Sequence, residues 1–154
     1  MCGLSGYFDT KLNRKVDNSE EILLLMLQIQ KHRGPDFKDF KIYENCGLAH
    51  NRLSIIDLSP SANQPFEIGD RFSIVFNGEI YNYKEICGHF LSGVQLKSDS
   101  DTEVLLRLYE KLGPECLKHL RGMFSIAIFD RLKKTLFLAR DRVGIKPLYY
   151  TSTQ

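Results

Sequence analysis

Apolar residues recur along the chain with two spacings, and each spacing predicts a different kind of element. Alternation of apolar and polar side chains, or a short apolar run between turn residues, predicts a β-strand. The stretches with this pattern are 4–8, 37–43, 47–56, 72–76, 123–129, 135–139 and a last one that starts over 148–151. Turn residues predict two hairpins, one around Glu44 and Asn45 and one over 130–134.

Helical spacing accounts for most of the other apolar positions. An amphipathic stretch over 22–29 predicts a helix that ends near His32, because Gly34 and Pro35 cannot continue it. A short helix is also predicted over 83–90.

The clearest helix begins after Ser98 and stops at Gly113. Ser100 and Glu103 have the spacing of a capping box, and Val104 begins an apolar stripe with helical period. Antiparallel strand pairs interleaved with two substantial helices favour an α+β fold, in which sheets are covered by helices. A chain of 154 residues without repeats or linkers suits one domain.

Composition excludes several classes of partner and site. The net charge is +2 and the basic residues form no stripe, so we expect no nucleic-acid partner. The most apolar stretch is too short to cross a bilayer, so we expect no membrane partner. The four cysteines lack the spacing of a zinc site and fit a reducing compartment, so the predicted location is cytoplasmic.

The first three residues carry the strongest chemical signal. If Met1 is removed, Cys2 becomes the N-terminus and has a thiol and a free α-amino group in one residue. The neutral amine can accept the thiol proton near neutral pH, which makes an N-terminal nucleophile. The plain alternative is that Cys2 is a small, inert second residue.

Five stretches together resemble the N-terminal glutaminase domain of asparagine synthetase, within the class II glutamine amidotransferase family. They are 1–3 (MCG), 32–36 (HRGPD), 48–57 (LAHNRLSIID), 76–82 (FNGEIYN) and 140–150 (RDRVGIKPLYY). The resemblance runs from end to end of the chain. It implies an N-terminal nucleophile hydrolase fold, a four-layer αββα sandwich of two antiparallel sheets with outer helices.

The resemblance also implies catalytic roles for Cys2, Asn77 and Gly78. Cys2 would attack the side-chain amide of glutamine, and the Asn77 side chain with the Gly78 N–H would form the oxyanion hole. Composition alone gives a different interpretation of Asn77 and Gly78, because Asn-Gly between β segments is the strongest short signal for a type I′ hairpin turn.

By the same resemblance, Arg52 binds the substrate α-carboxylate, and Asp101 with Glu79 binds the α-ammonium. Ile55 and Ile56 would contact glutamine through their backbone. Structural explanations exist for the two main charged residues. Arg52 could be a surface residue paired with an acid such as Asp57, and the carboxylate of Asp101 is favourable at a helix N-terminus for capping reasons alone.

Two of the five stretches receive no catalytic role. Residues 32–36 are explained as a helix end and a turn, and the loop 140–147 is implied to lie near the glutamine site or a partner domain. The mechanism requires no imidazole, so His50, His89 and His119 are interpreted as ordinary residues.

The implied reaction is hydrolysis of L-glutamine to glutamate and ammonia without a metal or organic cofactor. ATP and Mg²⁺ are expected only in a synthetase domain outside this chain, which would pass the ammonia to aspartate or to a carboxylated sugar. The family pattern continues past 148–150, so we expect a domain over 1–154 truncated at its C-terminus, with an unpaired strand edge that allows a homodimer. The alternative is a glutamine-binding fragment without turnover.

Overall fold

The strands form two antiparallel sheets in the computed structural model, which describes residues 1–11 and 16–152. The smaller sheet has the order β1-β3-β2, from β1 (Gly3–Phe8), β2 (Phe37–Ile42) and β3 (Cys46–Arg52). The larger has the order β4-β5-β6-β7, from β4 (Phe66–Ile68), β5 (Phe72–Ile80), β6 (Gly122–Asp130) and β7 (Thr135–Arg140).

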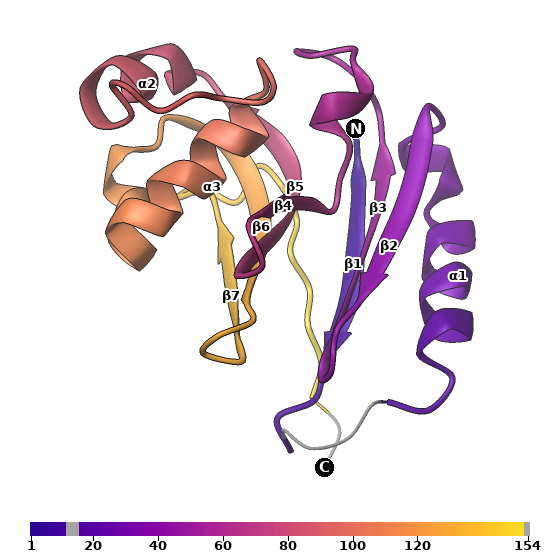
Figure 1. Ribbon diagram of the computed structural model, residues 1–154. Coiled ribbons are helices and arrows are strands. Elements are labelled where there is room, and N and C mark those ends of the chain that lie inside the picture. Colours follow the sequence, from indigo (N-terminus) through magenta and orange to yellow (C-terminus); the bar gives the residue numbers. More distant parts are fainter. Residues whose placement is uncertain (12–15, 153–154) are drawn as a thin grey trace.

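Helices cover the outer face of each sheet, so the molecule has four layers (Figure 1). Helix α1 (Ser19–Ile29) lies on the smaller sheet, and α2 (Tyr83–Phe90) and α3 (Asp101–Leu112) lie on the larger one. Short 3₁₀ turns occupy Lys31–Arg33, Pro60–Ala62 and Gly113–His119. The αββα sandwich implied by the family resemblance is therefore confirmed. In the part of the chain that the structure describes, no helix has the length and apolarity needed to span a membrane.

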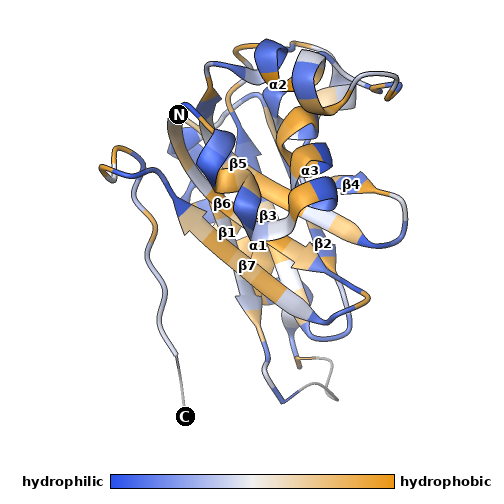
Figure 2. Ribbon diagram, turned by 90° about the vertical axis from the view of Figure 1, so that its left-hand side faces the viewer, coloured by the Kyte–Doolittle hydropathy of each residue, from blue (hydrophilic) through white to orange (hydrophobic). Residues whose placement is uncertain are grey.

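Three apolar clusters fill the spaces between the layers. One lies between α1 and the smaller sheet and contains Leu23, Leu27 and Ala49. The largest packs α2 and α3 on the larger sheet. The apolar colour in Figure 2 accordingly follows the strands, while the helices carry polar and apolar residues on different faces.

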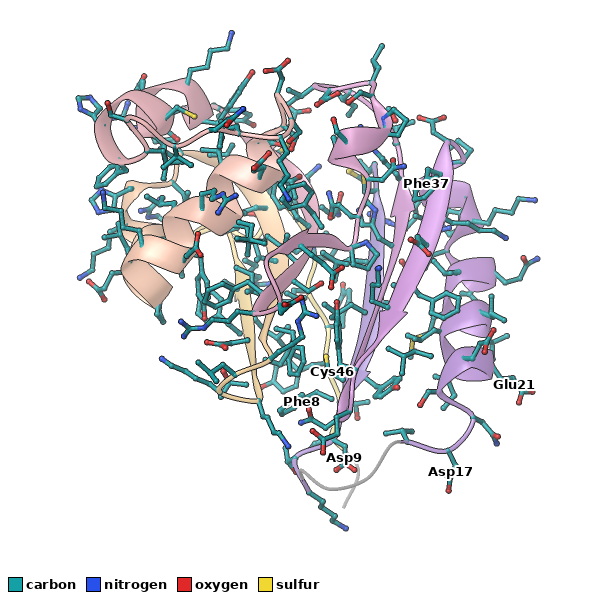
Figure 3. The ribbon with its side chains drawn as sticks, in the orientation of Figure 1. Phe8, Asp9, Asp17, Glu21, Phe37 and Cys46 are labelled. Atoms are coloured by element: carbon teal, nitrogen blue, oxygen red, sulfur yellow. The ribbon has the colours of Figure 1, made fainter. Side chains whose placement is uncertain are left out.

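The third cluster lies between the two sheets and fixes which side chains face inward. It contains Cys46 and Leu48 of β3 and Val75 of β5, with Leu4 and Phe8 of β1 packed against it. Figure 3 shows Phe8 and Cys46 at one end of this inner space. Because side chains alternate along a strand, residues an even number of positions away also face inward.

Most predicted elements are confirmed. Both hairpins form, and their strands pair in antiparallel register as β2–β3 and β6–β7. The clearest predicted helix is α3, in which the Ser100 hydroxyl accepts the Glu103 N–H and Gly113 ends the helix. The other half of the capping box is absent, because the Glu103 carboxylate accepts the N–H groups of Lys97 and Ser98 instead.

Four strand predictions need correction. Strand β5 continues through Asn77 and Gly78 without a turn, because these residues pair with Ser125 and Phe124 of β6. The predicted strand 47–56 ends at Arg52, and the strand expected from 148 does not form in the described residues. The short strand β4 was missed, since three residues give too little alternation to detect.

Candidate active site

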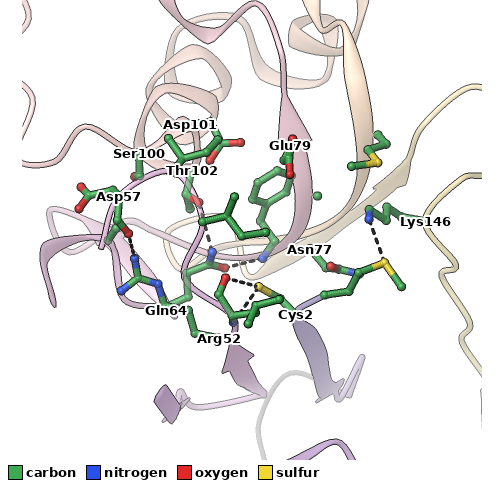
Figure 4. Close-up of a pocket in the computed structure, with 18 residues that line it drawn as sticks. Cys2, Arg52, Asp57, Gln64, Asn77, Glu79, Ser100, Asp101, Thr102 and Lys146 are labelled. Atoms are coloured by element: carbon green, nitrogen blue, oxygen red, sulfur yellow. Dashed lines mark hydrogen bonds between the residues drawn. The ribbon is translucent and has the colours of Figure 1, made fainter. Parts of the chain in front are cut away.

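Three predicted site residues lie on the same strand faces as the apolar cluster between the two sheets. Cys2 lies two positions before Leu4, Arg52 four after Leu48, and Asn77 two after Val75, so all three face the space between the sheets. They line one pocket at the end where β1 begins and β3 ends (Figure 4). The other predicted site residues, Ile55, Ile56, Gly78, Glu79 and Asp101, line the same pocket.

The Cys2 thiol is held by the backbone of the chain that follows β3. The Leu53 N–H donates to Cys2 Sγ at 3.3 Å, and the thiol lies 3.5 Å from the Leu53 carbonyl oxygen. Burial raises the pKa of the Cys2 thiol, while the Leu53 N–H and the Arg52 charge act in the opposite direction. The thiol therefore needs a base to become a nucleophile near neutral pH.

One edge of β5 presents a row of backbone groups to the pocket. The contacts Tyr81 N–H to Arg121 and Arg131 N–H to Arg71 show that odd-numbered residues bond within the β5–β6 ladder. In an antiparallel pair, the even-numbered residues then direct their N–H and C=O groups to the opposite side. Strand β4 meets that side only as far as Ile74, so the groups beyond it need other partners.

Side chains satisfy the N–H groups at two of these positions and leave the middle one free. The Phe76 N–H donates to Gln64 Oε1 at 2.6 Å, and the Ile80 N–H donates to Asp101 Oδ2 at 2.9 Å. Gly78 lies between them, lines the pocket, and its N–H meets no acceptor among residues 1–11 and 16–152. A free, preplaced N–H is the kind of donor that stabilises an oxyanion.

Gly78 is required where it stands, and Asn77 completes the donor pair. A Cβ at position 78 would lie 2.0 Å from the Met123 carbonyl oxygen, so a larger residue would push β5 off β6. The Asn77 side chain is 4% exposed, and no hydrogen bond holds it to the described part of the chain. Its amide is thus available to a ligand in the pocket.

Asp101 is a buried carboxylate at the first position of α3. It is 5% exposed, and burial raises its pKa to about 6; the N–H groups of Ile80 and Thr102 act in the opposite direction, and the nearby charge of Glu79 adds to the rise. Two acids close together favour a cation between them. The structural explanation of Asp101 also holds, since it satisfies the Ile80 N–H.

Arg52 is not the surface residue of the alternative interpretation. It is 6% exposed, and its guanidinium donates to the carbonyl of Ser59 at 2.9 Å, to Asn63 Oδ1 at 2.6 Å and to the carbonyl of Asp57. The Asp57 carboxylate instead accepts the N–H groups of Ser59 and Asp99. These contacts use three of the five N–H groups of Arg52, and two remain for a planar anion.

His50 joins the two sheets beside the site. Its Nε2 lies 3.0 Å from the Phe76 carbonyl oxygen, which can only accept, so Nε2 carries the proton. Nδ1 is buried without a partner in the described residues, and burial lowers the pKa of His50 to about 4. His50 is therefore a neutral core residue that anchors β5 to β3, consistent with its interpretation as non-catalytic.

We expect His50 and Asp101 to affect stability in opposite directions between pH 6 and pH 4. The pKa of His50 is lower in the folded than in the unfolded chain, so its contribution is lost as pH falls. The pKa of Asp101 is higher when folded, so acidification stabilises the fold. Each effect is about 1.4 kcal/mol per pH unit, and the two nearly cancel.

Urea unfolding at several pH values tests this cancellation. Relative to the parent, His50→Gln should gain stability on acidification from pH 6 to pH 4, and Asp101→Asn should lose it. If the free energy of unfolding changes with pH in the same way in all three proteins, the pKa shifts assigned to His50 and Asp101 are wrong.

Three residues in or beside the site were missed by sequence reasoning. Arg33 donates from Nε to the Cys2 carbonyl at 3.0 Å, so the 32–36 stretch also holds the backbone of Cys2. Gln64 lines the pocket. Lys146 also lines it, is 4% exposed, and has its Nζ 3.0 Å from Met1 Sδ. The loop 140–147 therefore does lie at this site, as the resemblance implied.

The 32–36 stretch requires glycine at position 34, because the backbone there packs against β3. A Cβ at Gly34 would lie 2.3 Å from the Asn51 carbonyl oxygen and 2.6 Å from the Arg52 carbonyl carbon. The absence of a side chain lets this turn pack directly on the end of β3. From there, Asp36 Oδ2 accepts the Ser54 N–H at 2.8 Å and fixes the loop after Arg52.

Comparison with known proteins places this arrangement in a family. Residues 1–154 match the family described as glutamine amidotransferase domain. The chain is 44% identical over 152 residues to asparagine synthetase [glutamine-hydrolyzing] 2 of Bacillus subtilis, covering 98% of the chain and 20% of that protein. It is 38% identical over 149 residues to asparagine synthetase B [glutamine-hydrolyzing] of Escherichia coli, covering 97% of the chain and 26% of that protein.

A solved structure supports the fold. The glutamine phosphoribosylpyrophosphate amidotransferase of B. subtilis superposes with a TM-score of 0.56 at 21% identity, over 70% of this chain and 25% of that one. The chain spans between a fifth and a third of the length of the curated relatives it matches. The family matches the whole length of the chain, and the Cys2 thiol and the free Gly78 N–H lie in one pocket. The chain therefore belongs to the glutamine amidotransferase domain family.

Proposed function

We propose that this domain hydrolyses L-glutamine to L-glutamate and ammonia through a covalent intermediate on Cys2. The observation that carries the proposal is the placement of the Cys2 thiol and the free Gly78 N–H in one pocket, between residues that can bind both ends of a free amino acid. Arg52 has two N–H groups left for the α-carboxylate, and Asp101 with Glu79 supplies negative charge for the α-ammonium. Ile55 and Ile56 line the pocket and would contact glutamine through their backbone.

The proposed reaction requires the free α-amine of Cys2, so Met1 must first be removed. The amine takes the thiol proton, and the thiolate attacks the amide carbon of glutamine. Asn77 and the Gly78 N–H hold the resulting oxyanion. The C–N bond then breaks, and ammonia leaves with the proton from the Cys2 ammonium.

The second half of the reaction regenerates the thiol. A water molecule gives a proton to the amine and attacks the thioester carbon, and glutamate leaves as the C–S bond breaks. Nucleophile, base and oxyanion donors all come from the chain, so the mechanism requires no metal or organic cofactor in this half-reaction.

The direct test compares the processed chain with the same chain retaining Met1, prepared by inhibiting methionine aminopeptidase and verified by intact mass. The processed chain should release ammonia and glutamate in a one-to-one ratio. The chain with Met1 should be inactive, because its Cys2 nitrogen is an amide and Met1 itself lines the pocket. Absence of turnover by the processed chain would favour the glutamine-binding fragment without catalysis.

Glutamine binding should weaken as pH falls through about 6. Asp101 must be ionised to bind an ammonium group, and its pKa is raised to about 6 by burial. Below that pH, the Kd for glutamine of Cys2→Ala, which binds without turnover, should rise about tenfold per pH unit by calorimetry. Asp101→Asn in the same background should bind glutamine more weakly at pH 8 and lose this pH dependence, whereas a dependence that persists unchanged would show that another group is responsible.

The ammonia acceptor is proposed from the relatives rather than from the pocket. Similarity to glutamine-hydrolysing asparagine synthetases favours aspartate, activated with ATP and Mg²⁺ by a synthetase domain that would be the partner of this one. The chain is also 39% identical to amidase chry2 of Gibberella zeae. Similar sequences therefore occur in proteins that are not named asparagine synthetase. Combining this domain and the purified synthetase domain with glutamine, aspartate, ATP and Mg²⁺, and assaying for asparagine, would decide between aspartate and another carboxylate.

A further inference from the structure

Gln64 links the two halves of the pocket through both ends of its side-chain amide. Its Oε1 accepts the Phe76 N–H at 2.6 Å, and its Nε2 donates to Thr102 Oγ1 at 3.2 Å. A backbone N–H can only donate, so the Phe76 contact fixes which end of the amide is the oxygen. Gln64 is 6% exposed and Thr102 is 3% exposed, so neither contact competes with bulk water.

The two residues joined by Gln64 are neighbours of functional groups. Phe76 directly precedes Asn77 on β5, and Thr102 directly follows Asp101 on α3. A second link joins the same two elements, because Asp101 Oδ2 accepts the Ile80 N–H at 2.9 Å. Helix α3 is thus attached to the edge of β5 on both sides of the free Gly78 N–H. Figure 4 shows the attachment through Gln64 and Thr102.

The carbonyl group of Phe76 is held as well. It accepts a hydrogen bond from His50 at 3.0 Å, so both backbone polar groups of Phe76 are bound by buried side chains. Strand β4 does not extend far enough to bond to Phe76. Gln64 therefore replaces a missing ladder contact and adds a connection to α3 that a strand would not supply.

We propose that Gln64 is a positioning residue that sets the distance between the oxyanion donors on β5 and the ammonium-binding carboxylate on α3, and so selects the length of the amide substrate. The proposal rests on the proposed glutaminase function. Glutamine and asparagine present the same charged groups and differ by one methylene between the α-carbon and the amide. A fixed spacing between Asp101 and Gly78 lets only one of them place its amide carbon at the thiol.

Two variants separate the two contacts of Gln64. Thr102→Val is nearly isosteric and removes only the contact to α3. Gln64→Leu removes both contacts. Gln28→Leu on the exposed face of α1 is the matched control and should behave as the parent.

The measurement is kcat and KM for glutamine and for asparagine, with thermal melts to verify folding. Thr102→Val should raise KM for glutamine with little change in kcat and reduce the preference for glutamine over asparagine about tenfold, the scale of one methylene. Gln64→Leu should in addition lower kcat about tenfold, because the peptide that precedes the oxyanion donors is released.

The outcomes distinguish this proposal from the function on which it rests. A processed parent chain without glutaminase activity overturns the proposed function and the role of Gln64 together. An active parent whose folded Thr102→Val variant keeps its KM and its substrate preference overturns the role of Gln64 alone.

Discussion

Cys2→Ala is expected to lower ammonia release from glutamine by about 10⁴-fold or more, since no other residue can take over a covalent intermediate. The Cys2 thiol, which is the proposed nucleophile, lies in the pocket and accepts a hydrogen bond from the Leu53 N–H at 3.3 Å. The loss should appear in kcat, and binding of glutamine by calorimetry should remain, because alanine leaves the residues at both charged ends of the substrate in place.

The matched control is Cys87→Ala, which removes a half-buried thiol on α2 outside the pocket and should leave turnover near that of the parent. Mass spectrometry of the acid-quenched parent should show an adduct on Cys2 during turnover, and none in Cys2→Ala. Turnover by Cys2→Ala at more than a few per cent of the parent rate would mean that a general base activates water directly, and the covalent mechanism would fall.

Alternation alone could not predict that Cys2, Arg52 and Asn77 meet in one pocket, because the predicted strand 72–76 stops before Asn77 and the way the strand faces meet is known only from the structure. In the structure, each shares its strand face with an apolar residue of the cluster between the sheets. The roles of the three residues could not be predicted this way, because alternation states which face a residue occupies and nothing about its chemistry. The family resemblance supplied the roles, which stay predictions until activity is measured.

Asn77 and Gly78 show how a local signal can fail. Asn-Gly favours a hairpin turn in isolation, but here both residues continue a ladder with β6 that extends over the whole of β5. The glycine serves close packing on the Met123 carbonyl rather than a turn. The long pairing outweighs the preference of two residues, which a short sequence window cannot reveal.

Gln64, Arg33 and Lys146 mark the limit of sequence reasoning for this site. Gln64 contacts residues 12 and 38 positions away, and Arg33 reaches the Cys2 carbonyl from 31 positions away. Single polar residues in loops give no periodic signal, so their partners become visible only in three dimensions. The strand expected from 148 failed for a related reason, because Tyr149 and Tyr150 have β propensity but are 91% and 84% exposed, without a paired neighbour in the described residues.

Asn77→Ala should lower kcat for glutamine by about 10² to 10³-fold while leaving KM within a few-fold, because an oxyanion donor acts on charge that develops only after attack. The alkylation rate of Cys2 by iodoacetamide is the internal control and should match the parent, since alkylation forms no oxyanion. Asn77→Asp should be at least as impaired, as it places a negative charge where the oxyanion forms. If KM rises and kcat is unchanged, Asn77 binds the ground-state amide, and the Gly78 N–H is left as the only oxyanion donor that the described residues supply.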